Sequence, residues 1–398
     1  MRDEIARIKA PDFPHEPGLG LDHIDEVFRD LEKTLTEDLE SGSPPDLIQA
    51  AAEDTLQALD RYLPLIGFML RATNVRNAFE LHGPLRSLAE RLLGKPIHVV
   101  LASEWEFSPF TYRSIVELPD FVLIGLPASE SGNGLIVPLA GHELGHAVFE
   151  RKGVRGGLET PVAAALVKAI KRKWTEYSLV YLDIAKKDVA GPAGQETWQR
   201  YFDWAMDQCE ETFCDFFGLL LFGESYLHAF AYLLAPSLRL RSFSYPSMLT
   251  RVRNLVKAAI AFQIPVPPGF KSEFRESQDD FTVGERFFCS LADDAVVDAV
   301  PLLIKEAKRI AHDLGVVPRN KNAIQKALRD LQRIIPASAA PDLATIANAG
   351  WMAHHDADLW ADYTDVAKRR SAVLNDLVLK SVEILDIRSR LAKAGLSA

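Results

Sequence analysis

Hydrophobic and polar positions in the first 95 residues follow the period of a helix. Apolar residues recur every three or four positions over 21–39, and the polar segment 41–46, rich in Ser, Gly and Pro, interrupts the pattern. The same spacing resumes over 47–70 and again over 85–93. We therefore expect an N-terminal helical region at 1–95.

The pattern changes after residue 96. Three segments rich in Val, Ile and aromatic residues, 97–107, 110–118 and 121–127, are separated by Ser-Pro and Pro-Asp turns. They are the only good strand candidates, and they predict a small sheet with one edge beside the following helix. Helical patterns dominate elsewhere, so the predicted fold class is mainly α (α+β).

Helical spacing returns in the last third of the chain. The turn-forming segment 264–269 marks a boundary, and the final pattern, 362–393, carries an apolar stripe that is either core or a dimer seam, with core favoured. We predict a catalytic core at 96–263 and a helical region at 264–398 packed on that core.

The segment 141–150 brings in candidate chemistry, because it contains His142, Glu143 and His146 in the order H-E-x-x-H. On a helix the two imidazoles lie one turn apart on one face, where they can share a zinc ion. Glu143 can then deprotonate a water held by the metal. The alternative is an amphipathic core helix whose histidines are merely hydrogen-bonded.

Flanking residues support a helix around this motif. Pro138 suits a first helical turn, and Gly153 suits a helix end. Gly141 and Gly145 are poor helix formers, so their presence predicts that backbone or substrate comes close to this helix.

A third ligand is expected, because catalytic zinc usually has three protein ligands. Glu211 and Asp215 lie one helical turn apart, so Glu211 can bind the metal while Asp215 accepts the free ring N–H of a ligating histidine. Glu210 and Asp207 are the alternative ligands, and a solvated acidic patch is the alternative without metal.

Together, the two motifs resemble the gluzincin clan of zinc metallopeptidases over about 97–262. They are similar in particular to the group of CAAX prenyl proteases and bacterial heat-shock membrane peptidases, whose second motif is E-x-x-A-D followed by a small residue. Here Glu211, Asp215 and Gly218 match, whereas Cys214 stands in place of the usual alanine, a residue of similar size. The resemblance implies peptide hydrolysis with Zn²⁺, and an extended peptide substrate held by the edge strand, for which 121–127 is the candidate.

A further part of the resemblance lies at 244–255, where the group often carries His-Pro followed by an arginine. Pro246 and Arg251 match, whereas Tyr245 stands in the place of the histidine. The resemblance implies that Tyr245 donates to a developing oxyanion and that Arg251 contacts substrate. An ordinary helix start with proline in its first turn remains equally open.

Composition narrows the class of protein. A net charge of −10 and a pI near 5.6 argue against nucleic acid or an anionic membrane as the main partner. The apolar segment 216–236 is interrupted by Gly, Glu, Ser and His, so it predicts two core helices and no membrane span. The absence of a secretory signal and the three scattered cysteines make the cytoplasm the expected location.

The sequence therefore predicts a soluble zinc metallopeptidase with Glu143 as general base. The alternative is a non-catalytic regulatory or partner-binding protein built on the same fold. The segment 351–360 offers His354, His355 and Asp358 as a second metal group. Adjacent histidines point about 100° apart on a helix, so we expect surface or active-site rim there.

Overall fold

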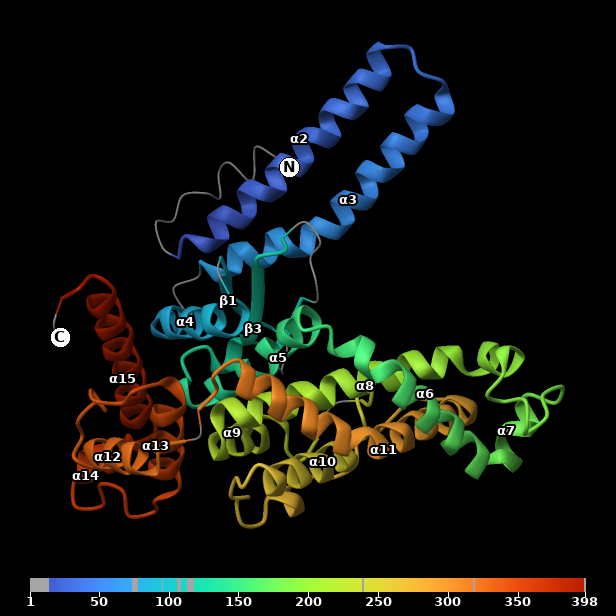
Figure 1. Cartoon of the computed structure of the whole chain (residues 1–398). Helices are drawn as coiled ribbons and strands as arrows, with labels where there is room; N and C mark the ends of the chain where they lie inside the picture. The colour runs from blue at the N-terminus through green and yellow to red at the C-terminus, as the bar shows by residue number, and fades with distance from the viewer. Residues whose placement is uncertain are drawn as a thin grey trace. The chain divides into compact units, whose positions relative to one another are not determined.

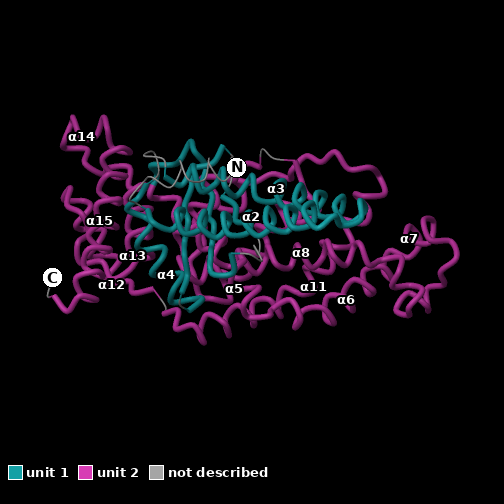
Figure 2. The backbone as a smooth tube through the Cα atoms, turned by 90° about the horizontal axis from the view of Figure 1, so that it is seen from above, with its two compact units in different colours: residues 1–133 teal, residues 134–398 magenta. Residues whose placement is uncertain are grey.

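A computed structural model describes residues 14–73, 78–94, 96–105, 109–112, 118–237, 240–317 and 319–396. Helices predominate in these residues, and the strands they contain form one three-stranded sheet, which confirms the predicted mainly α (α+β) class (Figure 1). Contacts divide the chain into two compact units, 1–133 and 134–398, which Figure 2 colours separately. Each unit is described by itself.

Unit 1 combines a helical hairpin with the sheet. Its elements are α2 (Glu16–Glu40), α3 (Pro45–Ala72), η1 (Phe79–Leu81), α4 (His82–Leu93), β1 (His98–Glu104), β2 (Phe110–Thr111), β3 (Phe121–Pro127) and η2 (Ala128–Glu130). The three helices expected from the N-terminal pattern are confirmed. Helices α2 and α3 pack side by side (Figure 1), and their apolar faces form one core with β1 and β3. Residues 1–13, 74–77 and 95 lie outside the described part of the predicted region 1–95.

The sheet has the order β1-β3-β2. Strand β1 runs parallel to β3, with His98 opposite Phe121, and β2 runs antiparallel to β3, with Phe110 opposite Gly125. The prediction that 121–127 is an edge strand is therefore wrong, because β2 folds back onto the free side of β3. Of the predicted strand 110–118, residues 113–117 lie outside the described part.

A buried ion pair links α2 to α4 within unit 1. The Glu16 carboxylate accepts a hydrogen bond from Arg86 Nη1 at 2.9 Å, and its other oxygen lies 3.2 Å from His82 Nε2. Burial alone would raise the pKa of Glu16, but His82 and Arg86 outweigh it and lower the pKa to about 2. The start of α2 is thus fixed electrostatically.

Unit 2 is built around α8. Its elements are η3 (Gly134–Leu139), α5 (Ala140–Arg151), α6 (Val154–Arg172), α7 (Trp174–Val180), α8 (Pro192–Phe222), α9 (Glu224–Leu234), α10 (Met248–Ala261), η4 (Phe270–Glu273), α11 (Val283–Asp313), α12 (Lys321–Gln332), α13 (Leu343–His355), α14 (Thr364–Lys368) and α15 (Arg370–Lys393). Helices α5, α6 and α11 all pack against α8 (Figure 1), and α11 also packs along α6.

The predicted boundaries at 95/96 and 263/264 do not coincide with this division. The strands belong with the N-terminal helices, because β1 packs on α2, α3 and α4. The C-terminal helices complete the core of unit 2, because α11 buries Phe288, Leu291 and Val296 in the packing of α11 with α8 and α6. The helix that carries the H-E-x-x-H motif therefore shares its unit with the chain's C-terminal part.

Two further expectations hold in unit 2. Leu374, Leu377 and Val378 of α15 are buried, and α15 packs against α13 and η3, as the core interpretation of its stripe predicts. The segment 216–236 contains the end of α8 and the whole of α9. Among the described helices, none combines the length and apolarity needed to cross a membrane.

Candidate metal centre

Helix α5 carries the H-E-x-x-H motif in its first two turns. Pro138 lies in the 3₁₀ turn just before α5, and the chain leaves the helix at Lys152 and Gly153, whose φ of 62° suits glycine. The side chains of His142, Glu143 and His146 are all buried. The motif therefore faces the interior of unit 2.

Small residues let α5 approach α8 closely. A Cβ atom added at Gly145 would lie 2.9 Å from the Cα of Cys214, and one at Gly141 would lie 2.9 Å from the Phe222 ring. From the other side, a Cβ atom at Gly218 would lie 3.1 Å from the backbone N of His142. The prediction that backbone comes close at the two motif glycines is confirmed. We call these contacts of Gly141, Gly145, Cys214 and Gly218 the glycine seam.

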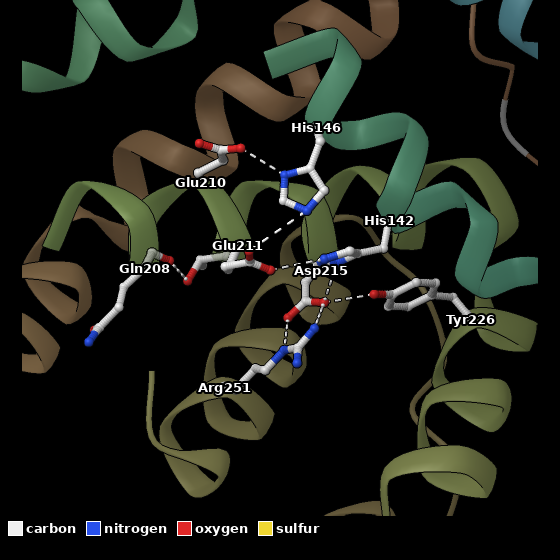
Figure 3. A network of polar contacts seen from close by, with 9 residues as sticks. His142, His146, Gln208, Glu210, Glu211, Asp215, Tyr226 and Arg251 are labelled. Atoms are coloured by element: carbon white, nitrogen blue, oxygen red, sulfur yellow. Dashed lines mark hydrogen bonds and ion pairs between the residues drawn. The ribbon is translucent and has the colours of Figure 1, made fainter. Parts of the chain in front are cut away.

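This approach brings both imidazoles to Glu211 of α8 (Figure 3). His142 Nε2 lies 3.0 Å from one carboxylate oxygen of Glu211, and His146 Nε2 lies 3.7 Å from the other. One ligand atom of each residue lies within 4.8 Å of the others, and these three form the one such group found among the described residues. Asp207, an alternative ligand, does not belong to the group.

Each imidazole also meets a carboxylate at its other nitrogen. His142 Nδ1 lies 3.0 Å from Asp215, which is the contact that the spacing of Glu211 and Asp215 predicts. His146 Nδ1 lies 2.7 Å from Glu210. Glu210 was considered only as an alternative ligand, and the structure gives it this orienting contact instead. Both Nε2 atoms are thereby directed toward Glu211, as ligation of one ion requires.

Asp215 is itself fixed by two neighbours (Figure 3). Arg251 of α10 donates from Nε at 2.6 Å and from Nη2 at 2.8 Å, and the Tyr226 hydroxyl of α9 donates at 2.7 Å. Burial alone would raise the pKa of Asp215, but Arg251 and His142 hold it well below its usual range. The guanidinium of Arg251 thus bonds to Asp215, and the substrate contact expected of Arg251 stays a prediction. Neither sequence motif indicates the contribution of Tyr226.

Tyr245 lies at the same centre. Helix α10 has Ser247 as its N-cap, with the side chain accepting from Thr250 N. A helix does start here, as the alternative has it, but Pro246 lies just before the helix and not in its first turn. The Tyr245 ring lies under the Arg251 guanidinium at 5.0 Å. Burial, the charge of Glu211 and a hydrogen bond to Glu211 raise the pKa of Tyr245 well above its usual value. The phenol therefore stays protonated and able to donate.

The centre concentrates negative charge. Glu143, Glu210, Glu211 and Asp215 are all buried, and Arg251 pairs with Asp215. Burial raises the pKa of Glu143, the two histidines oppose this, and Glu211 adds to it. Buried carboxylates need compensating cations. Two imidazole nitrogens and one carboxylate are a donor set that zinc uses, so these residues suit a divalent ion of that kind.

Comparison of the chain with protein-family models, curated proteins and solved structures finds no match. The functional conclusion therefore rests on the chemistry of this centre.

Proposed function

We propose that the protein is a zinc-dependent metallopeptidase. The observation that supports this most is the convergence of His142, His146 and Glu211, with the buried Glu143 next to the first ligand. A structural zinc site usually has four protein ligands, whereas three ligands leave a position for water or substrate. A binding module has no use for Glu143, whereas hydrolysis requires a base at that place.

The residues of the chain have separate tasks in this mechanism. His142, His146 and Glu211 would hold the zinc, which when bound would supply a Lewis acid for the peptide carbonyl. Glu143 takes a proton from the attacking water and passes it to the leaving amine, and a raised pKa makes its carboxylate a stronger base. The single O–H of Tyr245, which hydrogen-bonds Glu211 in the resting protein, would turn from Glu211 to the oxyanion as charge develops on the carbonyl oxygen.

The proposal includes a peptide or protein substrate in the cytoplasm and no nucleic-acid partner. The net charge of −10 would repel a polyanion. All three cysteines are free and buried, as is usual where thiols stay reduced.

The decisive experiment is Glu143→Gln. The amide keeps the shape of the side chain but cannot take a proton, so we expect full zinc content and a loss of peptide cleavage by several powers of ten. Glu150→Gln, exposed on the same helix, is the matched control and should cleave like wild type. A broad set of unstructured peptides and elemental analysis provide the measurements. Cleavage retained by zinc-loaded Glu143→Gln would exclude this mechanism.

A further inference from the structure

A pair of histidines outside the metal centre joins α9 to α13. His355 Nε2 and His228 Nδ1 lie 2.9 Å apart and share a hydrogen bond, in which one ring donates the proton that a bound metal ion would displace. His355 belongs to the segment 351–360, where the sequence offered His354 and Asp358 as its partners in a second metal group. The structure instead brings a nitrogen from another helix to His355.

The two rings are held by Trp351. Its indole stacks on His228 at 5.5 Å and 17°, and on His355 at 5.6 Å and 25°. Trp351 is itself buried and donates from Nε1 to the backbone oxygen of Leu135 at 2.9 Å. The pair is therefore positioned in advance by a fixed side chain, which lowers the entropy cost of binding a ligand between the rings.

The ring geometry suits two bonds to one ion. The ring centroids lie only 4.5 Å apart with the planes at 41°, closer than a head-on contact of the two nitrogens would allow. The lone pairs of the two nitrogens therefore do not point straight at each other, but make an angle with the line that joins the two nitrogens. Two metal–nitrogen bonds of about 2.0–2.1 Å at a right angle would separate the nitrogens by about 2.9 Å, whereas a tetrahedral angle would require about 3.3 Å.

The surroundings keep these nitrogens available. The His355 ring is only partly shielded by its neighbours; this partial desolvation, together with His228 and His354, lowers the pKa of His355 to about 4, so its ring is neutral at pH 7. The Glu224 carboxylate lies 3.8 Å from His228 Nε2, so a negative charge stands near the pair. His355 is exposed, so ions can reach it.

We propose that His228 and His355 form a second metal site, for a divalent first-row ion of square-planar or octahedral preference such as Ni²⁺ or Cu²⁺, with water completing the coordination. Imidazole ligands and a right-angle geometry favour these ions over tetrahedral zinc. An ion bound there would link α9 to α13, so it would raise the melting temperature of the folded chain.

Ni²⁺ is the probe for this site. Zinc-loaded wild-type protein should bind one additional equivalent of Ni²⁺ by calorimetry, keep its zinc by elemental analysis, and melt at a higher temperature. His228→Gln and His355→Gln should each lose the additional equivalent and the rise in melting temperature. His312→Gln, an exposed histidine whose neighbour is Asp313, is the matched control and should behave as wild type.

The outcomes separate this site from the metal centre. Equal Ni²⁺ uptake by wild type and both glutamine variants, or displacement of zinc as the sole event, would overturn the proposal. If the chain holds no zinc, the proposal is still supported when the His146→Ala variant binds one Ni²⁺ and the His355→Gln variant does not. Uptake lost equally in His312→Gln would show that exposed histidines bind the ion without selectivity.

Discussion

At the scale of single residues, the metal centre gives each imidazole its own carboxylate. Asp215 faces His142 and Glu210 faces His146. A carboxylate on the non-ligating nitrogen fixes the ring and makes the other nitrogen a better donor. The two carboxylates thus act through the histidines, whereas Glu211 has both of its oxygens directed at the ligand nitrogens.

Substitutions should separate these roles. Glu210→Ala and Asp215→Ala should each weaken zinc affinity about 10- to 100-fold, because the ring loses its orienting partner. Glu211→Ala should lose the ion, because a ligand is removed. Glu210→Gln should lie nearer wild type, since an amide oxygen still accepts a hydrogen bond. Competition with a chelator of known affinity measures all four. If Glu211→Ala keeps zinc and Glu210→Ala loses it, Glu210 is the ligand and Glu211 is the residue that orients a histidine.

Sequence spacing predicts part of this arrangement. The i, i+4 relation within one helix is enough to place Asp215 beside Glu211. Glu210 and Glu211 are about 100° apart around the helix axis, but the contact of Glu210 with His146 depends on how α5 crosses α8. Tyr226 reaches Asp215 from the next helix, across the turn at Gly223. Contacts between elements depend on their packing, which one-dimensional spacing does not contain.

At the scale of elements, the glycine seam sets the distance between α5 and α8. Gly145→Ala should lower the unfolding free energy by roughly 1–3 kcal/mol, because the added methyl group overpacks against Cys214. The better helix propensity of alanine should offset about 1 kcal/mol of that loss. Zinc affinity should fall with it. Gly157→Ala, on α6 with no atom within 4 Å of the added Cβ, should instead gain up to about 1 kcal/mol. Chemical denaturation compares the two, and equal gains would show that the seam tolerates a methyl group.

The link between α2 and α4 predicts a pH dependence for unit 1. The pKa of Glu16 is about 2 in the folded chain and near 4.5 in the unfolded chain. Because the folded value is the lower one, its stabilisation is complete above pH 4.5 and is lost as the pH falls toward 2. Glu16→Gln should therefore be less stable than wild type at pH 7, and the difference should shrink between pH 4.5 and 2. Denaturant unfolding at several pH values tests this, and a constant difference would contradict it.

At the scale of the whole molecule, the division between residues 133 and 134 predicts which fragments fold. Fragment 134–398 contains every residue of the metal centre together with α11, so it should fold and bind one zinc. Fragment 96–263 lacks α11 and would expose the faces of α6 and α8 that α11 covers, so it should aggregate. Circular dichroism and metal analysis compare them. A folded, zinc-binding 96–263 would restore the division expected from sequence.

The pattern of the chain predicts its helices better than its grouping into units. Helical periodicity is local, so α2, α3, α4 and α9 appear where it predicts them. The pairing of β2 with β3, which makes β3 the middle strand, is a contact that periodicity does not specify. The packing of α11 onto α8 joins segments far apart in sequence. Both helices have apolar faces, but an apolar face does not specify which other helix will pack against it.

The glycine seam also has a consequence for the evolution of this chain. A methyl group at Gly141, Gly145 or Gly218 meets the opposite helix, so these positions should accept few replacements even though they bind nothing. If the chain binds the proposed ion, proteins that share this centre should preserve G-H-E-x-G-H together with E-x-x-C-D-x-x-G, in which alanine or serine could stand for the cysteine. Distant relatives are better sought with that longer signature than with the ligands alone, because the spacers record how closely the two helices must approach.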